Sequence, residues 1–139
     1  MPRTRSTRAA RAGRAPALPR AGGRLSTRRP TRPPRAVLIL AAYPRRAAAE
    51  RAARLLVRGR VLACATVSAP ARAFYFWKGR EVAEAGALLY GKTTAARARD
   101  AIRLIRQSHP DRVPEILVLK IAAGEPTYLA WVADQVARR

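Results

Sequence analysis

The sequence is poor in cysteine, histidine and methionine, and it has no long hydrophobic run. Its 139 residues include one Cys, one His and one Met. A single cysteine excludes an intrachain disulfide, so a reducing compartment, the cytoplasm, is expected. The longest apolar run covers residues 36–43. A membrane-spanning helix needs about 20 apolar residues, so no membrane association through such a helix is predicted.

Acidic residues are also scarce, and the excess of basic residues is unevenly distributed along the chain. The chain has 29 Lys and Arg against 8 Asp and Glu, a net charge of +21. Residues 1–35 contain 11 Arg, 6 Pro and no acid. Too few apolar side chains are present there to offset the entropy of ordering, so residues 1–35 are predicted to be a disordered extension. Weak, nonspecific binding of polyanions through this basic tail is expected.

Three interpretations of this tail stay open. An Arg-rich, acid-free N-terminus is typical of organellar transit peptides, which makes an organellar location the alternative to the cytoplasm. The tail is otherwise a dispensable extension, or a basic arm that contacts nucleic acid.

Residues 36–139 carry a net charge of +10 and predict one folded domain. Pro44 precedes a helical pattern that Gly59 ends, Pro70 marks a bend, and Lys78-Gly79 supplies a turn. Thr94 is placed to cap a second helix. The expected strands are 36–43, 61–68 with an extension through 73–77, 82–93 and 115–121, and the expected helices are 47–58, 95–108 and about 127–136.

This order of strands and helices is the split βαβ pattern. It predicts an α/β (α+β) fold, a ferredoxin-like sandwich with an extended β-hairpin and a C-terminal helix. Many unrelated functions share this fold, so the fold does not define an activity.

Four short motifs follow one another along residues 36–139. They are Arg60–Cys64; Tyr75–Gly79 with Glu84 and Lys92-Thr93; His109-Pro110 with residues 113–116; and Gly124 with Tyr128-Leu129 and Trp131. In this order they resemble the CutA (divalent-cation tolerance) family. The resemblance implies a ferredoxin-like fold, a homotrimer made partly by extended hairpin strands, and a role in tolerance of divalent metal ions, especially copper.

The resemblance also implies Cys, His and Glu ligands for a copper or other divalent cation. Glu115 matches the family motif and His109 is a nearby candidate, with Cys64 or a neighbouring subunit completing the set. A packed or capping histidine and an inert buried thiol are the alternative roles of His109 and Cys64. This sequence departs from the family at Asp111-Arg112, which follow His-Pro, and in its basic charge.

Aromatic residues form two groups. The run Phe74–Trp77 lies among basic residues and could stack on single-stranded nucleic acid. Alternation along a strand favours packing instead, with one pair in the core and the other against a neighbouring subunit. Tyr128 and Trp131 are three residues apart on the last helix, which predicts one packed face. The predicted packing and trimer residues are Tyr75, Trp77, Tyr128 and Trp131.

Catalytic machinery is not evident, so the protein is not expected to be an enzyme. Gly86–Thr93 matches the phosphate-loop pattern, but its middle residues are strand-like rather than flexible. The leading prediction is a trimeric, metal-responsive binding protein. The two rivals are a basic nucleic-acid-binding module and a small-molecule sensor that resembles the trimeric nitrogen-regulatory proteins.

Overall fold

A computed structural model describes residues 34–138, so the disorder predicted for residues 1–35 concerns a segment almost wholly outside the described range. The predicted order of elements is confirmed, and most boundaries agree within one or two residues. The elements are β1 (Ala36–Tyr43), α1 (Arg46–Arg58), β2 (Cys64–Trp77), β3 (Arg80–Thr94), α2 (Ala95–Ser108), β4 (Ile116–Lys120) and α3 (Pro126–Val136).

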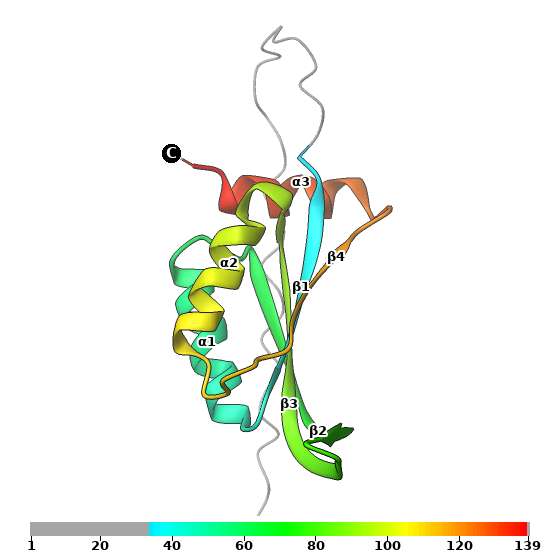
Figure 1. Ribbon diagram of the computed structural model, residues 1–139. Coiled ribbons are helices and arrows are strands. Elements are labelled where there is room, and N and C mark those ends of the chain that lie inside the picture. The colour runs from blue at the N-terminus through cyan, green and yellow to red at the C-terminus, as the bar shows by residue number, and fades with distance from the viewer. Residues whose placement is uncertain (1–33, 139) are drawn as a thin grey trace, which may run out of the picture.

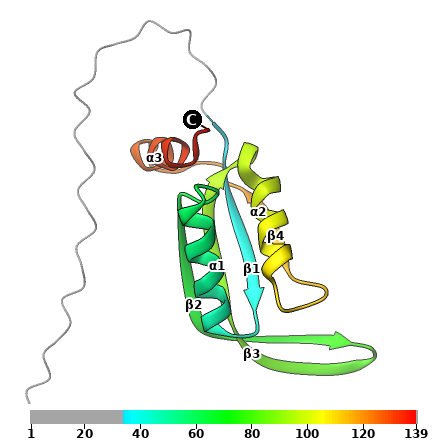
Figure 2. The ribbon, with the colours of Figure 1, turned by 90° about the vertical axis from the view of Figure 1, so that its left-hand side faces the viewer.

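The four strands form one antiparallel sheet in the order β2-β3-β1-β4. Strand β3 lies between β1 and β2, and α1 and α2 cover the same face of the sheet (Figures 1 and 2). This is the ferredoxin-like arrangement that the element order predicts. None of the helices in residues 34–138 is long and apolar enough to cross a membrane.

The core lies between this face of the sheet and the two helices. Alternate residues of β1 are buried, because successive side chains of a strand point to opposite faces. Helix α1 contributes Ala49, Ala52 and Leu56 at helical spacing, and α2 contributes Ala98, Ala101 and Ile105. Ile39 of β1 and Leu89 of β3 have no exposed surface.

The second strand begins later than predicted. Val61 and Leu62 were expected in the strand, but both backbone N–H groups donate to the carbonyl oxygen of Leu56. Their side chains are buried at the end of α1, so the chain joins the sheet only at Cys64. The predicted bend is present, because the β2–β3 register shifts between Ser68 and Ala71.

The β2–β3 hairpin extends beyond the helices (Figure 2). Its two-residue turn places Lys78 at φ 49° and Gly79 at φ 76°, the left-handed pair that a tight hairpin turn needs. The prediction that one aromatic pair enters the core is wrong for a single chain. Tyr75 and Trp77 are 39% and 49% exposed, and Phe74 and Phe76 are exposed further, because the hairpin projects past any element that could cover it.

Helix α3 packs across one end of the sheet. Val132 and Val136 are buried against Ala63, with Trp131 packed beside them. The rings of Tyr128 and Trp131 lie 5.8 Å apart, and Tyr128 is 38% exposed, so the packed face predicted for this pair stays a prediction. Glu125 caps the helix by accepting from the backbone N–H groups of residues 127 and 128, and these bonds lower its pKa. Thr94 occupies the N-cap position of α2, but its side chain makes no capping bond.

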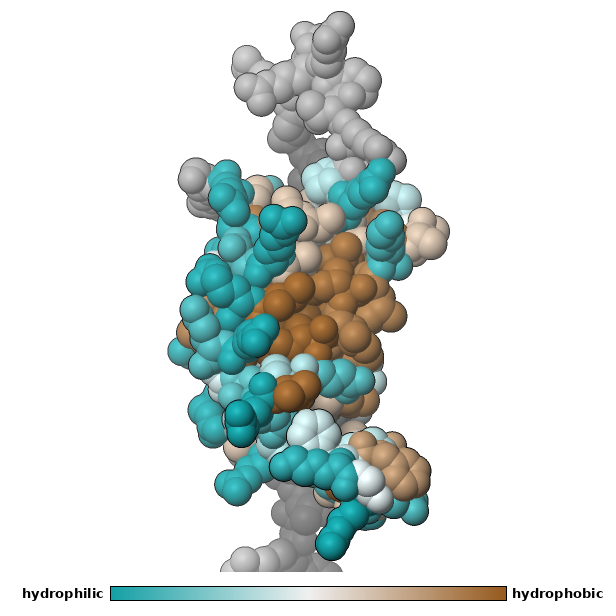
Figure 3. All heavy atoms as spheres, in the orientation of Figure 1, coloured by the Kyte–Doolittle hydropathy of each residue, from teal (hydrophilic) through white to brown (hydrophobic). Residues whose placement is uncertain are grey.

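The sheet face opposite α1 and α2 is largely apolar and only partly covered, and Lys92, which is paired with Leu38, is its charged residue. In the observed register, Leu40 pairs with Tyr90 of β3 and with Leu117 of β4, and directly paired residues point to the same face. Leu117 and Leu119 are 48% and 42% exposed. Figure 3 shows hydrophobic side chains gathered over the middle of the molecule, where Figure 1 places β1 and β4. We call this surface the open sheet face; it comprises Leu38, Leu40, Leu88, Tyr90, Leu117 and Leu119.

Candidate functional site

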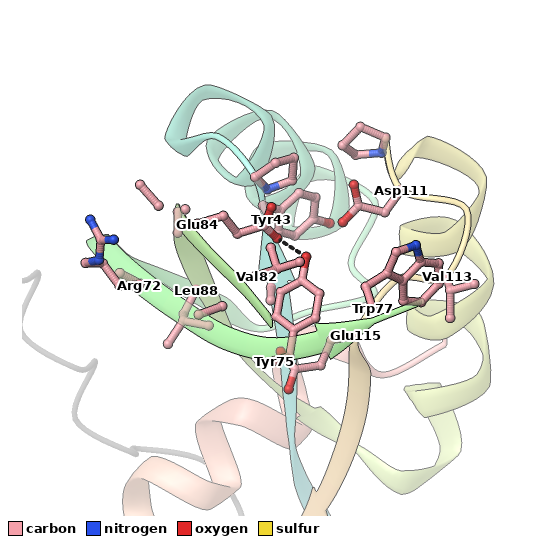
Figure 4. Close-up of a pocket in the computed structure, with 18 of the residues that line it drawn as sticks. Tyr43, Arg72, Tyr75, Trp77, Val82, Glu84, Leu88, Asp111, Val113 and Glu115 are labelled. Carbon is pink, nitrogen blue, oxygen red and sulfur yellow. Dashed lines mark hydrogen bonds between the residues drawn. The ribbon is translucent and has the colours of Figure 1, made fainter. Parts of the chain in front are cut away.

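A cleft of about 730 Å³ lies where the hairpin meets the end of β1. The hairpin strands form one side, and the segment from Pro110 to Glu115 and residues Ala42–Pro44 form the other. Its volume is in the range of small-molecule pockets. Figure 4 shows Tyr75 between Arg72 at one end of the hairpin wall and Trp77 at the other.

Acidic residues concentrate in this cleft. Three of the chain's eight acidic residues line it, although the chain as a whole is strongly basic. Carboxylate oxygens are the preferred ligands of hard divalent cations. The three are Glu84, Asp111 and Glu115, and Arg72 and Arg112 also line the cleft.

Glu84 is held by the hairpin itself. The hydroxyl of Tyr75 donates to Glu84 Oε1 at 2.8 Å, as Figure 4 shows. This hydrogen bond is the main cause of the raised pKa of Tyr75. The turn at Lys78-Gly79 pairs Trp77 with Arg80, and this register makes Tyr75 and Glu84 diagonal neighbours.

Tyr43 lies at the inner end of the cleft. Its side chain is 3% exposed, and its buried hydroxyl has no hydrogen-bond partner within residues 34–138. Burial raises its pKa to about 12. In Figure 4 its ring lies between the labelled Glu84 and Asp111. Tyr43 was not predicted as a site residue. The only feature of the sequence that could have indicated it is its position at the end of a buried apolar strand, just before Pro44.

Removing the Tyr43 hydroxyl is expected to leave the protein at least as stable at neutral pH. A buried hydroxyl without a partner costs free energy, so Tyr43→Phe should change the free energy of unfolding by about 0 to +1 kcal/mol. The Tyr43 pKa is about 12 when folded and about 10 when unfolded. Only the unfolded state ionises between these values, so the wild type should lose stability from pH 10 to 12 more steeply than the variant.

Urea unfolding of both proteins across this pH range measures the difference. Tyr75→Phe is the matched control, because it removes a hydroxyl that does have a partner. If Tyr43→Phe costs more than the control at neutral pH, the hydroxyl has a hydrogen-bond partner outside residues 34–138.

His109 is packed rather than open. Its side chain is fully buried, and its ring lies 4.4 Å from that of Tyr43. The backbone N–H of Asp111 donates to Nδ1 at 3.0 Å, so the proton of the neutral ring is on Nε2, which donates to the carbonyl oxygen of Ala42 at 2.7 Å. Both nitrogens are therefore engaged, and a metal ion would have to displace one of these bonds.

The three predicted metal ligands do not meet within one chain. Glu115 and His109 lie at the same end of β1, since the Glu115 carbonyl oxygen accepts from the N–H of Ala42. Cys64 of β2 is paired with Lys92 of β3, and Lys92 is paired with Leu38 of β1. Leu38 precedes Ala42 by four residues in β1, so Cys64 is about 13 Å along the strand from the end where His109 and Glu115 lie. Its Sγ lies 3.2 Å from the Tyr128 hydroxyl. In the part of the chain that the structure describes, no three His, Cys, Asp or Glu side chains are grouped to hold a metal ion.

Gly86–Thr93 is part of a continuous strand. The segment belongs to β3, and each of its residues from Ala87 onward is paired with β1. Its backbone N–H groups are therefore not arranged as a phosphate-binding loop. This agrees with the strand-like character predicted for the middle residues of the segment.

Comparisons with known proteins agree on one family. Residues 37–135 match the family model described as "CutA1 divalent ion tolerance protein". The divalent-cation tolerance protein CutA of Pectobacterium atrosepticum is 33% identical over 97 residues, which cover 70% of this chain and 88% of that protein.

Solved structures show the same relationship. CutA from Xylella fastidiosa is 31% identical with a TM-score of 0.72, covering 73% of this chain and 98% of that one. A protein from Archaeoglobus fulgidus, named a periplasmic divalent cation tolerance protein CutA, shares the fold at 24% identity, with a TM-score of 0.71 and coverage of 73% and 99%.

Proposed function

Because the chain belongs to the CutA1 family of divalent ion tolerance proteins, we propose that it works as a homotrimeric, non-enzymatic protein that binds a divalent cation. The observation that supports the homotrimer in this proposal is the open sheet face. A soluble monomer rarely exposes one contiguous apolar surface of this kind, and such a surface normally marks an interface.

The two edges of the sheet support a ring of copies. The projecting hairpin lies at the β2 edge, and the unpaired side of β4 lies at the opposite edge. Contact between the hairpin of one copy and the β4 edge of the next would be head-to-tail, and such contacts form a ring when the rotation between copies closes on itself. The family resemblance supports a ring of three copies. Assembly would also cover the exposed aromatic side chains of the hairpin.

The cleft supplies the oxygen ligands in this proposal. Asp111 and Glu115 are exposed at its wall, whereas His109 is already bonded on both nitrogens. One chain does not group three ligands within the described residues, so a neighbouring copy would complete the shell. Oxygen donors favour a hard cation such as Mn²⁺, while copper or zinc would require His109 to exchange a bond.

Glu115→Gln is expected to weaken cation uptake by about tenfold or more, because it removes a ligand charge without changing the size of the side chain. Native mass spectrometry of the full chain with Mn²⁺, Cu²⁺ or Zn²⁺ would count the bound ions. Glu81→Gln is the matched control, since it makes the same change at an exposed hairpin residue outside the cleft. Equal uptake by both variants and the wild type would exclude Glu115 as a ligand.

A small-molecule sensor is the second candidate, and the cleft itself favours it. About 730 Å³ is more than one cation needs, and Tyr75 and Trp77 offer aromatic surface on the hairpin wall of the cleft to an organic ligand. A thermal-shift screen with nucleotides tests this alternative, because a ligand that binds only the folded state raises the melting temperature. No shift at millimolar nucleotide would count against the sensor.

We also propose that the protein is cytoplasmic. The single cysteine supports the cytoplasm, while the Archaeoglobus fulgidus relative is named periplasmic. Fractionation of cells that express the full chain would distinguish these locations.

A further inference from the structure

The helical layer carries two rows of exposed arginines. At 3.6 residues per turn, Arg51, Arg54 and Arg58 lie within a stripe of α1 about 60° wide, on the side opposite its buried residues. A stripe of the same width runs along α2, turned away from the residues that α2 buries. We call these six residues the arginine face: Arg51, Arg54, Arg58, Arg99, Arg103 and Arg106.

These charges are poorly neutralised within the described part of the chain. Only Arg103 of the six has an ion pair there, at 3.5 Å from Asp100. Asp100 also pairs with Arg97 and Arg138. The other acidic residue of the two helices, Glu50, pairs with Arg46. Like charges three and four residues apart destabilise a helix, so these rows lower the stability of α1 and α2 unless anions neutralise them.

The arginine face would stay exposed in the proposed assembly. Helices α1 and α2 lie side by side on one face of the sheet, and the open sheet face is on the other (Figures 1 and 2). Each helix is about 20 Å long at 1.5 Å per residue. A trimer formed through the open sheet face would therefore present three such surfaces outward, and a monomer would still present one.

We propose that the arginine face binds the phosphate backbone of double-stranded nucleic acid without reading its sequence. Guanidinium groups bind phosphodiester oxygens bidentately, and the face contains arginine only. Each arginine row spans seven residue steps, about 10 Å at 1.5 Å per residue. Duplex DNA carries about one charge per 1.7 Å, so a row of this length faces enough phosphates to pair with its three arginines. Both helices pack flat on the sheet, so neither can enter a groove to contact base edges.

An anionic membrane is a less suitable partner for this face. Helices that bind membranes insert an apolar side into the lipid, but the apolar sides of α1 and α2 are buried in the core. Leu55, 52% exposed, is the only large hydrophobic residue of these two helices that is strongly exposed.

The test uses the full chain and a fluorescein-labelled DNA duplex of about 20 base pairs of mixed sequence, followed by fluorescence anisotropy between about 50 and 200 mM NaCl. In the face variant all six arginines of the arginine face are replaced by glutamine. The control variant removes the same charge from the N-terminal segment. Its substitutions are Arg3→Gln, Arg5→Gln, Arg8→Gln, Arg11→Gln, Arg14→Gln and Arg20→Gln.

The face variant is expected to bind the duplex about 100-fold more weakly, and its plot of log K against log salt should be less steep by about 5, since each phosphate contact contributes about 0.9. The control variant should lose less of its affinity for the duplex, and its plot of log K against log salt should change less in slope. Circular dichroism melts should show the face variant folded and at least as stable as the wild type, because glutamine and arginine have similar helix propensity and the repulsion between like charges is removed.

Three results would overturn the proposal. They are a face variant that binds like the wild type, a control variant that loses as much as the face variant, and wild-type protein that binds phosphatidylserine-containing vesicles more tightly than the duplex. None of these results depends on cation binding or on the number of copies, so the proposal can fail independently of the proposed function.

Discussion

Leu117→Glu is expected to convert the proposed trimer into a folded monomer. Leu117 lies on the open sheet face, paired with Leu40. In a single chain its side chain is about half exposed, so a carboxylate there stays in water and the fold is kept. In the assembly the same carboxylate would be buried without a partner, which costs several kcal/mol in each copy.

Light scattering after size-exclusion chromatography measures the mass, and circular dichroism checks the fold. Leu55→Glu is the matched control, because Leu55 is 52% exposed on the outer side of α1. It should leave the mass unchanged. A trimeric Leu117→Glu protein would place the interface away from the open sheet face.

Gly86→Ala is expected to destabilise the chain by about 3 kcal/mol. Gly86 lies on β3 at the floor of the cleft, where a Cβ atom would overlap the backbone carbonyl oxygen of Tyr43. Relief of this overlap requires β1 and β3 to separate, because a backbone oxygen cannot rotate away as a side chain can.

Chemical denaturation of Gly86→Ala and Gly124→Ala separates this cause from a general effect of losing glycine. The Cβ atom of the control would meet only the end of the Leu129 side chain, at 3.2 Å or more. We expect the control to cost less than about 1 kcal/mol. Equal costs in the two variants would mean that the Tyr43 carbonyl is not the obstacle.

Local sequence patterns were sufficient to predict the order of elements. The buried run Ala36–Tyr43, the helical spacing before Gly59 and the turn at Lys78-Gly79 are each determined by neighbouring residues. The start of β2 was mispredicted because the apolar residues Val61 and Leu62 pack against the end of α1 rather than in the sheet. Sequence periodicity does not distinguish these two ways of burying a short apolar segment.

The site was less predictable, because it depends on long-range register. The Cys64–Lys92–Leu38 pairing separates the cysteine from His109, and the His109–Ala42 bond joins residues 67 apart in the sequence. Glu84 could have been placed beside Tyr75 once the hairpin turn was known. The burial of Tyr43 could not have been predicted from the sequence, because it depends on how the chain after α2 folds back over β1.

The most direct test of a cation-binding trimer is the native mass of the full 15.2 kDa chain, recorded with and without a divalent cation. We predict a mass of three chains and a fixed number of ions per trimer. A trimer that takes up no cation would contradict the cation site and leave the assembly standing. A monomer at micromolar concentration would contradict the assembly on which the proposed function rests.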